Sequence, residues 1–92
     1  MFPSPVASDE VTAVMPAVVE LIRSVSEKAR TKVIQPETLL LEELALDSLD
    51  MVRVVMLMED RLGVCIDLDE VADMRSVADV ARSFARESRS AA

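Results

Sequence analysis

The stretch from residue 47 to residue 63 constrains the fold most, because it reads as one helix with both ends marked. Asp47 is a favoured N-cap residue, and Gly63 readily takes the positive φ of a helix C-cap. Between them, one set of apolar residues recurs at helical spacing and forms a continuous seam suited to a core. This set is Met51, Val54, Val55, Met58 and Leu62.

A second apolar row lies on another side of the same predicted helix. It consists of Leu49, Val52 and Met56, and it shares its side with Ser48, Arg53, Glu59 and Asp60. Apolar side chains surrounded by charge are typical of a protein interface. We therefore predict a partner-binding surface here, and we include Asp50 in it.

Ser48 is expected to be the first residue of this helix, with Asp50 in its first turn. The first backbone N–H groups of a helix are unpaired and the helix dipole is positive there, so the carboxylates of Asp47 and Asp50 are favoured. The Ser48 hydroxyl is left pointing into solvent at the same end. A hydroxyl in this position is well placed to carry a phosphate group.

The composition favours packed helices over a sheet. The 92 residues are 51% hydrophobic but include only two Phe and one Gly. The core must therefore consist of Val, Leu, Ile, Met and Ala, and the alternating pattern of strands is missing. We predict an all-α fold: a small antiparallel four-helix bundle with a long loop between the first and second helices and a short third helix.

Pro16 decides where the first helix begins. Either a short turn covers Asp9 to Val14 and the helix starts with Pro16, or one longer helix is kinked at Pro16; we favour the first alternative. The helix is expected to end near Arg30. A long loop follows over residues 31–43, anchored by Ile34, Leu39 or Leu40, and Leu44.

Two further caps follow Gly63. Asp67, with Glu70 three residues later, is expected to cap a short third helix that runs to about Met74. Ser76, with Asp79 three residues later, is expected to cap a last helix. Cys65 lies between two apolar neighbours, so we expect it to be a small core residue. We expect residues 1–14 to be disordered or loosely helical, 15–87 to form the domain and 88–92 to be a flexible tail.

The negative charge is concentrated around Ser48. The formal net charge is −7, and residues 42–73 hold ten acidic residues against two arginines, a net charge of −8. This charge argues against nucleic-acid binding and would steer a basic partner surface to the region.

Several functional classes lack the residues that they need. The chain has no histidine, which removes the usual general base of a serine hydrolase and the commonest metal ligand. The acidic run from Asp67 does not fit a calcium loop, because alanines occupy its glycine and bidentate positions, so we predict no metal. With one cysteine, no signal peptide and no membrane span, we expect a cytoplasmic monomer.

The residues from Leu44 to Asp50 resemble the signature of acyl carrier proteins. The similarity extends from about Met15 to about Phe84, through the same order of helices and loops. It implies a discrete carrier, itself not an enzyme, with 4'-phosphopantetheine on Ser48 and with Asp47 recognised by the transferase that attaches it. Implied partners are a phosphopantetheinyl transferase, an acyltransferase or ligase that loads the acyl group, and a ketosynthase or other processing enzymes.

Two positions depart from the family pattern. Many relatives have Gly in place of Ala45 and Glu in place of Arg53. These differences indicate a dedicated, secondary-metabolite pathway of fatty-acid-like or polyketide biosynthesis. A peptidyl or aminoacyl carrier and an unmodified helical interaction module remain the alternatives.

Overall fold

The computed structural model is all-helical, as predicted, and describes the backbone of residues 8–91 and the side chains of residues 10–87. Its helices are α1 (Ser8–Val25), α2 (Glu27–Arg30), α3 (Ser48–Leu62), α4 (Leu68–Asp73) and α5 (Val77–Ala91). Over the described backbone, extended pairing is confined to an isolated β-bridge between Leu39 and Ser76. None of the described helices has the length and apolar content needed to cross a membrane.

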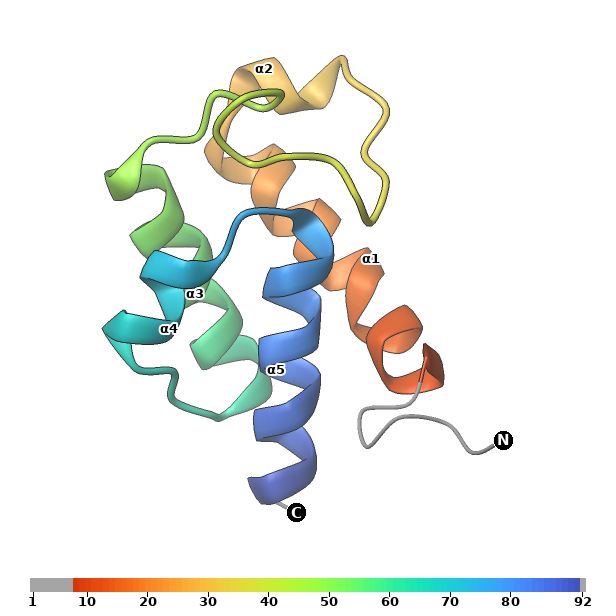
Figure 1. Cartoon of the computed structure of the whole chain (residues 1–92), viewed down its shortest axis with the longest axis vertical. Helices are drawn as coiled ribbons and strands as arrows, with labels where there is room; N and C mark the ends of the chain where they lie inside the picture. The colour runs from red at the N-terminus through yellow and green to blue at the C-terminus, as the bar shows by residue number, and fades with distance from the viewer. Residues whose placement is uncertain (1–7, 92) are drawn as a thin grey trace.

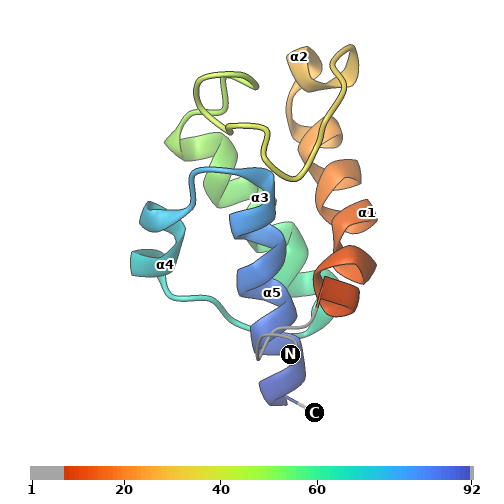
Figure 2. The same cartoon turned by 45° about the vertical axis from the view of Figure 1, so that its right-hand side comes forward.

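Helices α1, α3 and α5 form the body of the molecule, and α4 lies at its side (Figure 1, Figure 2). Helix α1 runs opposite to α3 and α5, which run in the same direction as each other. The predicted antiparallel arrangement is therefore wrong for α3 and α5. The reason is that residues 63–76, including α4, carry the chain back along the body, so α5 begins near the end where α3 begins.

The core consists mostly of aliphatic side chains from the three long helices and the loop before α3. The predicted core seam of α3 is confirmed: Val54, Val55 and Met58 are buried, and Met51 and Leu62 pack against them. Burying one such side chain contributes roughly 1.5–3 kcal/mol, so this seam holds α3 firmly. The largest fully buried side chains are those of Phe84, Ile22, Leu44, Leu46, Met58, Val18, Val54, Val77 and Val80.

Helix α1 begins earlier than we favoured, and Pro16 lies inside it. The alternative of one longer helix is correct. Val11, Val14 and Met15 come before the proline in the helix and are partly buried against the core. This packing outweighs the backbone hydrogen bond that a proline removes from a helix.

The first helix also ends earlier than predicted, because the backbone is extended at Ser26 (φ −121°, ψ 121°). The Ser26 N–H closes α1 by donating to the Ile22 carbonyl at 2.9 Å, and α2 follows as a separate turn. The Ser24 hydroxyl donates to the Leu21 carbonyl at 2.8 Å. Such side-chain bonds compete with helix continuation, which explains a break within the Ser24-Val25-Ser26 sequence.

The segment after α3 differs from prediction in two details. Asp67 is the N-cap of α4 but makes no side-chain cap bond there. Cys65 is exposed, so the expectation of a core cysteine is wrong. The reason is an alternation that buries Val64 and Ile66 on one side of an extended link and turns Cys65 outward.

The chain termini are only partly covered by the structure. Helix α5 continues through the predicted tail to Ala91, while Ala92 and residues 1–7 lie outside the described residues. Flexibility of residues 88–92 stays a prediction.

Candidate functional site

The N-terminus of α3 is closed by a reciprocal capping box. The Asp50 N–H donates to Asp47 Oδ1 at 2.8 Å, and the Asp47 N–H donates to Asp50 Oδ2 at 3.3 Å. The predicted N-cap is therefore confirmed. Because each carboxylate satisfies the other residue's backbone, the first turn is held in a single geometry.

Ser48 lies between these two residues as the first residue of α3, and it is exposed. Its hydroxyl makes no hydrogen bond with the part of the chain that the structure describes. The carboxylates that could have bonded to it are engaged by backbone N–H groups. A free hydroxyl is thus presented at the positive end of a helix dipole.

The loop before α3 fixes the position of this turn. Leu44 and Leu46 are buried, and the Leu46 N–H donates to the Leu40 carbonyl at 2.9 Å. Ala45 lies between the two anchors with a φ of 57°, in the left-handed region. This backbone turns the chain between two buried leucines and brings Asp47 to the surface.

A groove of about 590 Å³ opens beside Ser48. Met51 and Val52 of α3 contribute to its wall, as do Leu68, Val71 and Ala72 of α4. The remaining lining residues are Leu40, Leu41, Glu42, Leu46, Asp47, Ser48, Met74 and Arg75. The walls are mainly apolar, whereas Glu42, Asp47 and Arg75 provide charge.

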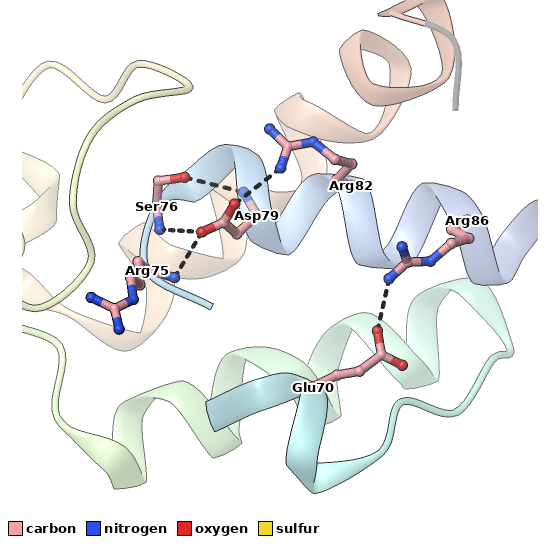
Figure 3. A network of polar contacts seen from close by, with 6 residues as sticks. All are labelled: Glu70, Arg75, Ser76, Asp79, Arg82 and Arg86. Carbon is pink, nitrogen blue, oxygen red and sulfur yellow. Dashed lines mark hydrogen bonds and ion pairs between the residues drawn. The ribbon is translucent and has the colours of Figure 1, made fainter. Parts of the chain in front are cut away.

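Asp79 ties the corner between α4 and α5, where Met74 and Arg75 line the groove (Figure 3). Its Oδ2 accepts from the Arg75 N–H at 2.9 Å and the Ser76 N–H at 3.1 Å, and its Oδ1 accepts from Arg82 at 3.0 Å. The Ser76 hydroxyl accepts from the Asp79 N–H in turn, so the cap predicted for this helix is confirmed. Burial alone would raise the pKa of Asp79, but the two backbone hydrogen bonds and the Arg82 guanidinium hold that pKa below its ordinary value.

The family profile described as the phosphopantetheine attachment site matches residues 16–84, which include the capped turn and the groove. This chain belongs to the acyl carrier protein family. The group that an acyl carrier protein of this kind bears is 4'-phosphopantetheine. The predicted family and cofactor are therefore confirmed.

Similar proteins named meromycolate extension acyl carrier protein occur in Mycobacterium bovis and in two strains of Mycobacterium tuberculosis. Each is 32% identical to this carrier over 76 residues, which is 83% of this chain and 63% of the relative. The match thus spans less than two thirds of the relatives' own length.

The predicted partner row of this acyl carrier protein is open to solvent. Leu49 and Met56 are 59% and 60% exposed, and Val52 is half-buried and lines the groove. Arg53 is exposed and makes no ion pair with the described residues. Binding of a partner by this row stays a prediction.

The acidic members of the predicted partner surface differ in their surroundings. Asp60 is exposed, whereas Asp50 and Glu59 are half-buried and accept hydrogen bonds from backbone N–H groups of the carrier itself. Asp50 belongs to the capping box, and Glu59 Oε2 accepts from the Ile66 N–H at 2.8 Å. Asp60 is therefore the acid in this set that has no structural bond of its own within the described chain.

Sequence reasoning missed the residues that complete the groove from other elements. Leu41 and Leu68 are 64% and 73% exposed at its lining, and Arg75 joins them from the α4–α5 corner. Leu57, 42% exposed on α3, was placed in neither apolar stripe. Leu41 is an apolar residue inside a loop and Leu68 one beside a helix cap, and these positions could have indicated a role in the groove. No feature of the sequence singled out Arg75.

Proposed function

We propose that Ser48 bears the 4'-phosphopantetheine arm and that the chain shuttles acyl groups between biosynthetic enzymes. The observation that carries the proposal is the exposed, unbonded Ser48 hydroxyl on the rigid first turn of α3. The arm, when bound, supplies a terminal thiol that holds the acyl group as a thioester. These residues fit the group, since Ser48 offers the point of attachment and the groove beside it offers space.

The residues around Ser48 would favour its modification by a phosphoryl transfer. Ser48 Oγ forms a bond to the phosphorus of coenzyme A that bears the pantetheine, as the pyrophosphate linkage to that phosphorus breaks. Adenosine bisphosphate leaves, and the hydroxyl proton passes to a base of the transferase. The capping box orients Ser48, and the helix dipole favours the phosphodiester that results.

The charge distribution supports reversible docking of basic enzymes near the arm. Ten acidic residues lie within residues 42–73, and charge of this kind raises association rates more than affinity. The proposed partners are the transferase, which would recognise Asp47, then an acyl-loading acyltransferase or ligase, and a ketosynthase or other processing enzyme. The chain is proposed to be a monomeric cytoplasmic substrate of these enzymes without catalytic activity of its own.

The pathway is proposed from two features. The name of the mycobacterial relatives refers to meromycolate extension, which favours the extension of an acyl chain in fatty-acid-like or polyketide biosynthesis. Arg53, at a position where the family resemblance leads us to expect an acid, favours a dedicated pathway with its own partner enzymes.

The intact mass after incubation with coenzyme A and a broad-specificity phosphopantetheinyl transferase tests the attachment site. We expect a gain of about one third of a kilodalton in the wild type and none in Ser48→Ala. Circular dichroism of Ser48→Ala should show that the variant is folded, because the Ser48 hydroxyl makes no hydrogen bond with the described residues that the mutation would remove. An unmodified wild type beside a modified reference carrier would refute the proposal.

A further inference from the structure

Of the residues that line the groove, Arg75 alone is basic. Two acids, Glu42 and Asp47, share the same lining. The structure shows no ion pair between Arg75 and either acid, although three other arginines are paired. Those pairs join Arg61 to Glu20, Arg82 to Asp79 and Arg86 to Glu70.

The backbone of Arg75 is fixed on both sides, whereas its side chain is free. The Arg75 N–H donates to Asp79 Oδ2, and the Arg75 carbonyl accepts from the Leu40 N–H, both at 2.9 Å. Figure 3 shows the guanidinium extending away from the Asp79 carboxylate, with no contact drawn to it. The position of Arg75 is therefore set by the fold, and its charge is available to a ligand.

The chemistry of Arg75 suits such an interaction. Arg75 is exposed at a groove whose walls are mainly apolar, including Leu40, Leu68 and Met74. A guanidinium can donate two parallel hydrogen bonds to a carboxylate or a phosphate, although solvent and salt screen the charge at an exposed site. The guanidinium of Arg75 is thus suited to bind anionic oxygens.

We propose that Arg75 binds an anionic oxygen of the group attached to Ser48 and thereby favours cargo that ends in a carboxylate. The inference rests on the proposed attachment to Ser48. Two parts of the attached group offer this chemistry, the carboxylate of the cargo and the phosphodiester of the arm. Glu42 and Asp47 repel either anion, so without Arg75 the charged part of the lining is purely acidic.

The test compares succinyl and butyryl cargo, which have the same number of carbon atoms and differ by a terminal carboxylate in place of a methyl group. Each is attached from its coenzyme A thioester by the transferase, on wild type, Arg75→Gln and Arg75→Lys. The charge-matched control is Lys28→Gln, since Lys28 is exposed on α2 and does not line the groove. Circular dichroism checks that every variant is folded.

The first readout is a ¹³C NMR titration of the labelled succinyl carboxylate. We expect the carboxylate to bind protons about threefold or more weakly on wild type than on Arg75→Gln. The difference should shrink with salt, persist in Arg75→Lys and be unaffected by Lys28→Gln. The second readout is the ³¹P shift of the phosphodiester in each protein, with butyryl cargo as the reference.

The outcomes separate the two sources and the underlying function. A carboxylate effect that depends on Arg75 supports recognition of the cargo, and a ³¹P effect alone supports recognition of the phosphodiester and refutes the cargo preference. If neither signal depends on Arg75 in a protein whose mass shows full loading, the inference is overturned while the proposed function stands. If Ser48 cannot be loaded, the proposed function fails and this inference fails with it.

Discussion

At the scale of single residues, Ala45 and Gly63 both have a positive φ, but only Ala45 carries a Cβ atom. Their φ angles are 57° and 69°. A residue with a Cβ atom is strained in this region by roughly 1–2 kcal/mol, whereas glycine is not. The turn that leads to Ser48 therefore carries backbone strain at Ala45 that the turn at Gly63 does not.

Ala45→Gly should stabilise the protein by about 0.5–1 kcal/mol. The relief of strain at Ala45 exceeds the extra freedom that glycine gives the unfolded chain. Urea unfolding would measure the change, with Gly63→Ala as the matched opposite variant. A Cβ at Gly63 meets no atom within 4 Å, so this second variant should lose about 1 kcal/mol through the backbone alone. A loss of stability in Ala45→Gly would contradict the explanation.

Asp79 should make stability depend on pH in the acidic range. Because its folded pKa lies below the ordinary value of 3.8, its contribution is fully present above that pH and is lost as the pH falls through the folded pKa. The difference in free energy of unfolding between wild type and Asp79→Asn should therefore be largest near neutral pH and shrink under acid. A difference that stayed constant from pH 6 to pH 3 would exclude this role.

Residue roles were predictable where the partners are close in sequence. The Asp47–Asp50 and Ser76–Asp79 caps join residues three apart and follow from local rules. The exposure of Cys65 was not predictable, because the turn of the chain after Gly63 decides which of three successive residues faces inward. The same holds for Glu70, whose partner Arg86 lies sixteen residues away.

At the scale of elements, α3 was predicted with correct bounds and α1 was not. In α3 the N-cap at Asp47, the apolar periodicity and the C-cap at Gly63 all predict the same helix. In α1 the proline signal conflicts with the packing of Val11 and Val14, and the packing prevails. Packing against a partner helix is set by the fold and cannot be read from local propensity.

Pro16→Ala should stabilise α1 by about 1–3 kcal/mol. Alanine restores the N–H that proline lacks and removes its clash with the preceding turn, and Pro16 is exposed, so no buried contact is lost. Chemical unfolding of the variant would measure the gain. Thr12→Ala, also exposed in α1, is the matched control that changes no backbone donor. An unchanged or lower stability of Pro16→Ala would show that the proline is already accommodated.

At the scale of the whole molecule, the all-helical class was predictable, but the number of helices and their directions were not: four helices were predicted, and the described chain has five. The direction of α5 depends on how far residues 63–76 travel along the body, and α4 has no buried residue that would mark its path in the sequence. The groove has the same origin, since it is assembled from α3, α4, the loop and the corner at Arg75. Only the groove residues that α3 contributes could be predicted from the pattern of the sequence.

Arg53→Glu should improve acceptance by housekeeping fatty-acid enzymes. The substitution extends the acidic surface near Ser48, and we expect kcat/KM with such an enzyme to rise about threefold to tenfold at low salt. Initial rates of transfer to the loaded carrier would measure it. Lys28→Glu makes the same change of charge on α2 and should have a smaller effect. No gain in Arg53→Glu would remove Arg53 from the argument about specificity.

The outward position of Cys65 gives the molecule an internal standard for its own modification. It is the one cysteine in the sequence, and it is exposed. A colorimetric thiol reagent should therefore find one reactive sulfur in the unmodified chain, a second once the arm is attached, and one again when the arm is acylated. Attachment and loading could thus be followed stoichiometrically by absorbance, and a Cys65→Ser variant would report the arm alone.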